Sequence, residues 1–196
     1  MTVQSNERHD TSRYSYYLDS AYYDHLAELM GAWQEDWSEP DPRVRSEVEN
    51  LLYREARLID DGRFNDWVEL FTDECLYWVP TTPGGGDPRR EVSHAFDDRR
   101  RLMDRIYWLR TGLAFCQIPS SRTRRLVTNV EVLDTPDRRL VRSNFLITEF
   151  RAGTTKTYAG WCGHELVRRD EQWRIAVKQV NLVDCEHGHE NLTLVL

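Results

Sequence analysis

Hydrophobic and polar positions divide the chain into a helical first part and a strand-rich second part. Between residues 41 and 60, apolar side chains recur at the spacing of one helix face. These positions are Val44, Val48, Leu51, Leu52 and Ile59. Asp41 and Pro42 form a typical helix start, and Gly62 suits the left-handed residue that follows a helix. Only Glu55 interrupts the apolar face of this predicted helix.

A shorter amphipathic segment follows and leads into a strand. Its apolar residues predict a second helix: Phe64, Trp67, Val68 and Phe71. The run Leu76–Val79 has strand character, and Pro80 stops it. The next ten residues, TTPGGGDPRR, are rich in Gly and Pro and predict a flexible loop. This loop is not a phosphate-binding loop, because it lacks the Lys-Ser/Thr pair of a Walker motif.

A third helix is expected from about Asp97 to Arg110, ending at Gly112. Its inward side chains are expected to be Leu102, Ile106 and Leu109. Its arginines most simply form a solvated face, with ion pairs to a partner as the alternative: Arg99, Arg100, Arg101 and Arg105.

From Arg124 onward the pattern changes to strands. Four strand segments follow one another: LVTNVEVLD, LVRSNFLITEF, TYAGWCGHELVRR and WRIAVKQVNLV. Three tight turns join them, so consecutive strands should pair antiparallel. Helices first and a meander last predict an α+β fold, in which one curved, mainly antiparallel sheet wraps around the helices.

The first 40 residues differ from the rest and are interpreted as an arm before a single domain, residues 41–196. A helix is predicted there from about Asp19 to Trp33. Five of the nine Tyr lie in the arm: Tyr14, Tyr16, Tyr17, Tyr22 and Tyr23. Aromatic side chains supply large contact areas, so the arm either packs on a neighbouring subunit or folds back onto its own domain.

Composition and charge narrow the class of protein. With 196 residues, 40% of them hydrophobic and 30% charged, the chain reads as one soluble globular domain. A formal charge of −7 argues against nucleic acid as a partner. No apolar run reaches the length of a membrane span and no signal core begins the chain, so a cytoplasmic location is expected. The four Cys are expected to be thiols.

Two Cys-His motifs raise the question of a metal site. Cys162-Gly-His164 and Cys185-Glu-His187-Gly-His189 resemble a Rieske iron–sulfur centre, but the second motif lacks the C-x-x-H spacing. A hairpin turning between Asp170 and Glu171 would also place Cys162 opposite Gln179 and Cys185 opposite Lys156, about 20 Å apart. We therefore expect no Rieske cluster in this chain.

Three weaker candidates for chemistry remain. His187 and His189 with Glu186 or Glu190 could form a two-His-one-carboxylate iron site, but a polar surface turn is the simpler interpretation. Ser120-Ser121 lacks the context of a nucleophile elbow and is interpreted as a loop. An acid–base set near a pocket mouth is the last candidate, although no spacing rule brings its members together: His94, Asp97, Asp60, Asp61 and Tyr77.

Five stretches together carry a family resemblance. They are LLYREARLIDDGRFNDWVELFTDECLYWVP, EVSHAFDDRRRLMDRIYWLRTG, SRTRRLVTNVEVL, VRSNFLITEFR and the ending HENLTLVL. In this order and with these gaps, the chain from about Asp41 to Leu196 resembles the small (beta) subunit of aromatic-ring-hydroxylating dioxygenases. One departure is the stretch GWCGH, residues 160–164, where such subunits often read like GRRED.

The resemblance implies a cone fold like that of nuclear transport factor 2 and scytalone dehydratase. It also implies an assembly of three large alpha and three small beta subunits, with the beta subunits forming a trimer. The large subunit would hold the Rieske [2Fe–2S] cluster, the mononuclear iron and the aromatic-substrate pocket. The small subunit would hold no metal, no cofactor and no catalytic residue.

The sequence therefore predicts a non-catalytic, structural beta subunit of a dioxygenase that cis-dihydroxylates an aromatic compound during aromatic catabolism. The alternatives are a stand-alone cone-fold dehydratase or isomerase and a small-ligand binding protein. The residues that select the aromatic substrate are expected in the alpha subunit.

Overall fold

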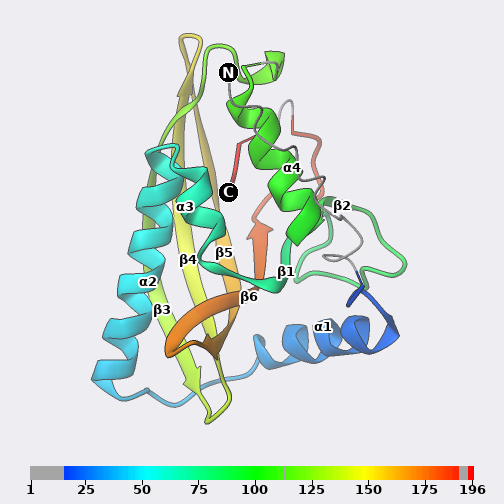
Figure 1. The fold of residues 1–196 in the computed structure, drawn as a ribbon, viewed down its shortest axis with the longest axis vertical. Coiled ribbons are helices and arrows are strands. Elements are labelled where there is room, and N and C mark those ends of the chain that lie inside the picture. The colour runs from blue at the N-terminus through cyan, green and yellow to red at the C-terminus, as the bar shows by residue number, and fades with distance from the viewer. Residues whose placement is uncertain (1–15, 113, 190–193) are drawn as a thin grey trace, which may run out of the picture.

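The computed structural model describes residues 16–112, 114–189 and 194–196. In this part of the chain, the helices are α1 (Ser20–Ala32), α2 (Pro42–Asp60), α3 (Phe64–Val68), α4 (Arg99–Arg110) and the 3-10 helix η2 (Phe115–Gln117) (Figure 1). An aspartate caps each of the three long helices by accepting a main-chain N–H of the first turn: Asp19, Asp41 and Asp98. The first two helices confirm the predicted helices at residues 19–33 and 41–60. No described helix is long and apolar enough to cross a membrane.

The strands of the described residues form one six-stranded sheet with the order β2-β1-β6-β5-β4-β3. Its strands are β1 (Phe71–Pro80), β2 (Ser93–Asp98), β3 (Arg122–Asp134), β4 (Arg138–Arg151), β5 (Thr154–Arg169) and β6 (Gln172–Leu182). The last four strands form the predicted antiparallel meander. Strand β1 pairs antiparallel with β2 and parallel with β6. The expected curved, mainly antiparallel sheet is thus confirmed.

The hairpin between β5 and β6 turns where the sequence predicted. Asp170 and Glu171 both have positive φ, at 47° and 62°, as a tight two-residue hairpin turn requires. The predicted register was nevertheless wrong by one residue, because Cys162 lies opposite Val180 and not Gln179. A register shift between Glu165 and Leu166 displaces the pairing in this way.

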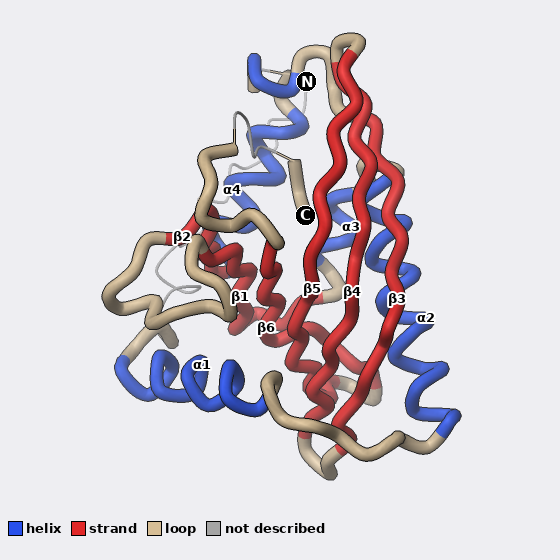
Figure 2. The backbone as a smooth tube through the Cα atoms, turned by 180° about the vertical axis from the view of Figure 1, so that it is seen from behind, coloured by secondary structure: helices blue, strands red, loops and turns tan. Residues whose placement is uncertain are grey.

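The sheet buries apolar side chains on both of its faces. Strand β1 shows the alternation, since Tyr77 and Val79 belong to one core while Leu76 and Trp78 belong to the other. The inner core lies between the sheet and helices α2, α3 and α4, and we call the space that it fills the interior of the cone. Figure 2 shows the sheet from behind, with α1 beside the lower ends of the strands.

Helix α1 builds the core on the outer face of the sheet. Leu26, Leu29 and Trp33 are fully buried there. A Cβ on Gly163 would lie 2.6 Å from the Trp33 ring, so this glycine of the divergent GWCGH stretch lets the indole approach the sheet. The described part of the arm therefore folds back onto its own domain. Residues 1–15 lie outside the described residues, and the division at residue 40 stays a prediction.

Three details of the helical part differ from the predictions. Residues 93–98 form the edge strand β2, so the following helix begins at Arg99 and not at Asp97. Phe71 opens strand β1 and is not part of the second helix. Arg99 is buried and not solvated, because its guanidinium donates to the Val68 carbonyl and pairs with Glu69. This arginine fastens α4 to the end of α3.

Candidate functional site in the interior of the cone

A cluster of three charged or polar side chains lies in the interior of the cone. Glu55 extends from α2, His164 from β5 and Lys178 from β6, and each is at most 4% exposed. The Lys178 ammonium donates to Glu55 Oε1 over 2.8 Å, and His164 Nε2 lies 3.3 Å from Glu55 Oε2. Trp67 Nε1 also donates to Oε1, over 3.1 Å. The residue that interrupts the apolar face of α2 is therefore the centre of the cluster.

Charge pairing fixes the protonation states of the cluster. Burial alone would raise the pKa of Glu55, but the Lys178 ammonium and His164 hold it well below its usual range. Burial would lower the pKa of Lys178, but the Glu55 carboxylate more than offsets this and raises it. Burial lowers the pKa of His164 against the opposing pull of Glu55, so this ring is neutral at pH 7. The cluster is therefore a buried ion pair between Glu55 and Lys178, with the neutral imidazole of His164 beside it.

The cavity beside the cluster is small. It measures about 30 Å³, and its polar lining includes Ser143, Cys162 and His164. Because His164 Nε2 faces the Glu55 carboxylate, Nε2 carries the proton and Nδ1 is an acceptor. This buried Nδ1 has no hydrogen-bond partner among the described residues. The cavity has about the volume of one water molecule.

Residues 194–196 cover the cluster. Lys178 Nζ donates to the main-chain oxygen of Leu196 over 3.1 Å. The Tyr77 hydroxyl accepts the Leu196 N–H over 3.1 Å, and the same hydroxyl lies 3.5 Å from the main-chain oxygen of Leu196. The Arg125 guanidinium donates to the Val195 carbonyl. Three side chains from different strands thus hold this short segment.

The predicted acid–base set does not form one site. Tyr77 and Asp97 are opposite each other on β1 and β2, but the carboxylate of Asp97 pairs with Arg105 over 2.6 Å. Asp60 pairs with Arg125. His94 Nε2 lies 3.0 Å from the Cys185 carbonyl oxygen. Asp97, Asp60 and His94 each have a partner outside the set, and none of these contacts joins two of its members.

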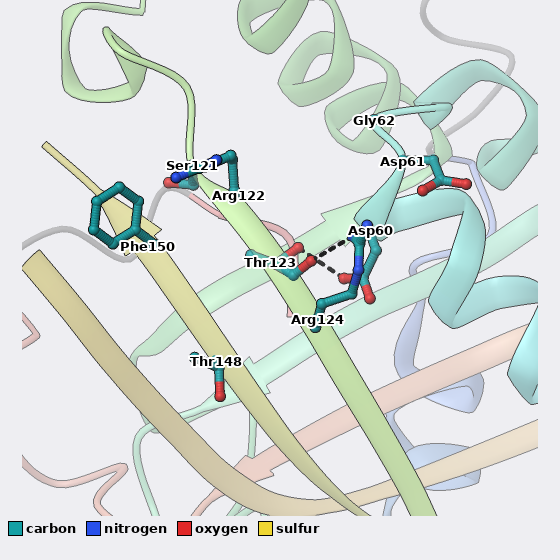
Figure 3. Close-up of a pocket in the computed structure, with 9 residues that line it drawn as sticks. All are labelled: Asp60, Asp61, Gly62, Ser121, Arg122, Thr123, Arg124, Thr148 and Phe150. Carbon is teal, nitrogen blue, oxygen red and sulfur yellow. Dashed lines mark hydrogen bonds between the residues drawn. The ribbon is translucent and has the colours of Figure 1, made fainter. Parts of the chain in front are cut away.

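Asp60 and Asp61 line a surface pocket. Figure 3 shows this pocket of about 540 Å³ around the start of β3, with Asp60 bonded to Thr123. Its remaining lining residues are Gly62, Ser121, Arg122, Arg124, Thr148 and Phe150. Asp60 Oδ2 also accepts the Arg125 main-chain N–H over 2.9 Å. The carboxylate fastens the end of α2 to β3, which is a structural role.

The Cys-His motifs lie in different places. Cys162 and His164 are on β5, as predicted, whereas Cys185 follows the end of β6. Glu186 and His187 are exposed, and Glu190 lies outside the described residues. The described residues contain no group of three His, Cys, Asp or Glu side chains that could hold a metal ion. All four Cys are free thiols, which confirms that prediction.

Sequence reasoning did not place Lys178 in a site at all, and it considered His164 only as part of a metal motif. Lys178 and His164 occupy inward positions of strands, and strand alternation was the signal that could have found them. A charged residue at an inward strand position must find a charged partner in the core. The matching signal was Glu55, the one polar residue on the apolar face of α2.

Protein-family comparison identifies residues 54–186 as matching the model described as "Ring hydroxylating beta subunit". The small oxygenase component of the p-cumate 2,3-dioxygenase system of Pseudomonas putida is 35% identical over 157 residues, covering 78% of this chain and 87% of that protein. The beta subunit of 3-phenylpropionate/cinnamic acid dioxygenase from Photorhabdus laumondii is 31% identical over 168 residues, covering 79% of this chain and 92% of that protein.

Solved structures share the fold. A chain of naphthalene 1,2-dioxygenase with indole bound superimposes with a TM-score of 0.72 at 19% identity, covering 91% of this chain and 100% of that chain. A putative scytalone dehydratase from Novosphingobium aromaticivorans gives 0.53 at 13% identity, covering 70% and 83%. These likenesses confirm the predicted cone fold. The chain belongs to the family of ring-hydroxylating dioxygenase beta subunits.

Proposed function

We propose that this chain is the structural, non-catalytic member of a cytoplasmic aromatic-ring dioxygenase in which three alpha and three beta subunits associate. The beta subunits form a trimer, with residues 1–40 as an arm near a subunit interface. The alpha subunit holds the Rieske cluster, the mononuclear iron and the aromatic substrate. This chain contributes no catalytic residue, cofactor ligand or metal ligand.

The main support for this proposal is that side chains fill the interior of the cone. Pockets for small molecules usually measure about 300–1,000 Å³, whereas the cavity beside Glu55 measures about 30 Å³. An aromatic ring does not fit there. The groups that could act as acid or base are also engaged, since Glu55 is held by three donors and its pKa is far below neutral. The interior of the cone therefore does not supply the site for the aromatic substrate, and we assign that site to a partner.

An exposed apolar area on the outer face of the meander supports a partner. Leu126 and Leu146 are neighbours across β3 and β4 and are 64% and 40% exposed. Phe150 lies further along β4, with the Arg122 guanidinium 4.8 Å from its ring centre. Figure 2 shows no described helix over this part of the sheet. Because β3 is also an edge strand, a neighbouring subunit that covers this area would shield both features.

Reconstitution tests the function. We expect this chain, mixed with the alpha subunit of its own system, to give an assembly of equal stoichiometry that converts an aromatic substrate in the presence of electron-transfer proteins. The chain alone should convert none. Conversion by the chain alone, or an active alpha subunit that never binds this chain, would refute the proposal.

One substitution tests the proposed contact area. Leu126→Glu should weaken the assembly, measured by light scattering, without lowering the thermal stability of the isolated chain. Val92→Glu is the matched control, because Val92 is 79% exposed and lies in the loop before β2, away from the outer face of β3 and β4. Equal effects of the two substitutions would contradict a contact at Leu126.

A further inference from the structure

We propose that copies of this chain associate head to tail, with an acidic surface on helix α1 of one copy docked on a basic surface of the next copy. This inference rests on the trimer of the proposed function and names the two surfaces that meet in it. The basic surface lies at the end of α2 and the start of β3 and consists of Tyr53, Arg54, Arg57, Arg122 and Arg124.

The basic surface is hollowed on both sides of α2. Arg54 and Arg57 line a hollow of about 350 Å³ where α2 passes into α3. A second hollow, of about 370 Å³, lies between α2 and β3, and its lining includes Tyr53, Arg57 and Arg124. Because Arg57 lines both hollows, they adjoin and can receive side chains from one neighbouring surface. Tyr53 is 45% exposed and supplies an aromatic ring at this place, as is common in protein interfaces.

The positive charge of the basic surface is not balanced by its surroundings. Arg54, Arg57 and Arg124 are exposed, and the exposed Asp61 lines the second hollow with two of them. Among the described residues, Arg54 and Arg57 take part in no ion pair. The dipole of α2 accounts for a cation at Arg57, in its last turn, but not for Arg124 on β3. In a chain with a formal charge of −7, this local excess of arginine indicates an acidic partner surface.

The acidic surface is the exposed side of α1 and the residues that follow this helix. Residues 16–41 contain seven Asp or Glu and no Lys or Arg. Glu28, Glu35 and Asp36 are exposed, and none of them has an ion pair within the described part of the chain. Ala27 is exposed beside Glu28, and its small side chain lets a second surface approach the helix closely. Helix α1 therefore packs its apolar side on the sheet and presents a negative side to a neighbour.

The two surfaces cannot meet within one chain. Figure 1 shows α1 at the lower right of the molecule and the end of α2 at the upper left. A contact between them therefore joins two different copies. Because the two surfaces differ, each copy offers its acidic surface to one neighbour and its basic surface to the other. Such a head-to-tail contact closes as a ring when the rotation between copies fits, and a ring of three copies is the trimer.

Arg124 connects the basic surface to the exposed apolar area of the meander. Arg124 and Leu126 are both exposed on the outer face of β3, because side chains two positions apart on a strand point the same way. A neighbouring α1 that pairs with Arg124 therefore also covers Leu126. The contact then has charged pairs around an apolar centre, which is the usual arrangement of a specific interface.

The first test cross-links the reconstituted assembly from α1. Ala27→p-benzoylphenylalanine places a photoreactive group beside Glu28 without changing a charge. The assembly is prepared from a mixture of isotope-labelled and unlabelled copies of this chain. Mass spectrometry should then find links between a labelled and an unlabelled copy that join α1 to residues 53–57 or 122–127. Val183 is the matched control position, because it is 78% exposed and belongs to neither surface, and the same group there should give no such link.

The second test reverses the charges of the two surfaces. Arg54→Glu with Arg57→Glu should lower the yield of this link about fivefold or more, because like charges then face each other. Adding Glu28→Arg and Glu35→Arg to the same chain should restore the yield, because opposite charges face each other again. All four side chains are exposed, so the fold should not change, and equal melting temperatures of the isolated chains check this.

Arg168→Glu with Arg169→Glu is the matched control, because both arginines are exposed at the end of β5, and it should leave the yield unchanged. An assembly that forms but links α1 only to the alpha subunit or to its own chain, or shows no link, would overturn this inference alone. So would a loss that the control shares or that the added arginines do not restore. If no assembly forms with the unaltered chain, the proposed function is refuted as well.

Discussion

Replacing Glu55 with Gln preserves the shape of the side chain and removes the charge at the centre of the interior cluster. Lys178 then keeps its ammonium in the core, with the main-chain oxygen of Leu196 and a neutral amide oxygen as acceptors. Breaking a buried ion pair by neutralising one partner costs about 3–5 kcal/mol, because the other charge stays desolvated. Glu55 also accepts from Trp67 and His164, so the amide nitrogen of Gln must face one of three donors.

We expect the free energy of unfolding to fall by about 3 kcal/mol or more, which corresponds to a melting temperature lower by roughly 6–12 °C for a chain of this size. Urea unfolding followed by tryptophan fluorescence at pH 7 measures the loss. The protein concentration should be held constant, because association also changes the apparent stability. A matched variant, Glu55→Leu with Lys178→Met, removes both charges and should recover most of the loss. A loss below about 1 kcal/mol for Glu55→Gln, or no recovery in the double variant, would refute the reasoning.

Three further predictions concern backbone packing, pH and metal. Gly160→Ala should lower the free energy of unfolding by about 2 kcal/mol or more, because the added Cβ would overlap the Asn181 carbonyl oxygen. Gly31→Ala is the control, because the space around Gly31 is free and this substitution should be neutral or stabilising. Equal denaturation midpoints for the two variants would contradict this prediction. Since the pKa of His164 is lowered in the folded state, the unfolded state binds more protons below about pH 6.5, and stability should fall by up to about 1.4 kcal/mol per pH unit on acidification. His164→Gln should flatten this slope in unfolding measurements between pH 6.5 and 5, and an unchanged slope would exclude His164 as its source. Elemental analysis of the purified chain should find far less than one iron per chain. The double substitution Cys162→Ser and His187→Ala should leave turnover of the reconstituted assembly largely intact. Stoichiometric iron with a Rieske-type electron paramagnetic resonance signal from this chain would contradict both expectations.

The meander could be predicted from the sequence because the signals for its strands and turns lie in short, local stretches of the chain. Alternating side chains and turn residues such as Asp170 and Glu171 identify strands and hairpins without knowledge of the rest of the chain. The same locality explains the register error, because the irregularity between Glu165 and Leu166 has no distinctive residue pattern. Strand β2 was missed for a related reason, since it is short and passes directly into the capping residue of α4.

The interior cluster was harder to predict because it depends on long-range contacts. Glu55 and Lys178 are 123 positions apart, and nothing in their neighbourhoods shows that they meet. Arg99 shows the same limit, because it looks like its solvated neighbours in the sequence and is buried only through the packing of α4 on α3. The residues of such sites can be suspected from polar interruptions of apolar patterns, but their pairing comes from the fold.

The parallel pairing of β1 with β6 has a consequence for folding. About 100 residues lie between these strands in the sequence. Bringing the strands together therefore has an entropic free-energy cost of about 4 kcal/mol, which arises before the contacts between them form. We therefore expect the meander, which consists of local hairpins, to form first and β1 to dock late against the free edge of β6. Until then, two copies can exchange β1 strands and become entangled as a domain-swapped dimer. Refolding yield should accordingly depend on protein concentration, and slow dilution should favour the native chain over the exchanged one.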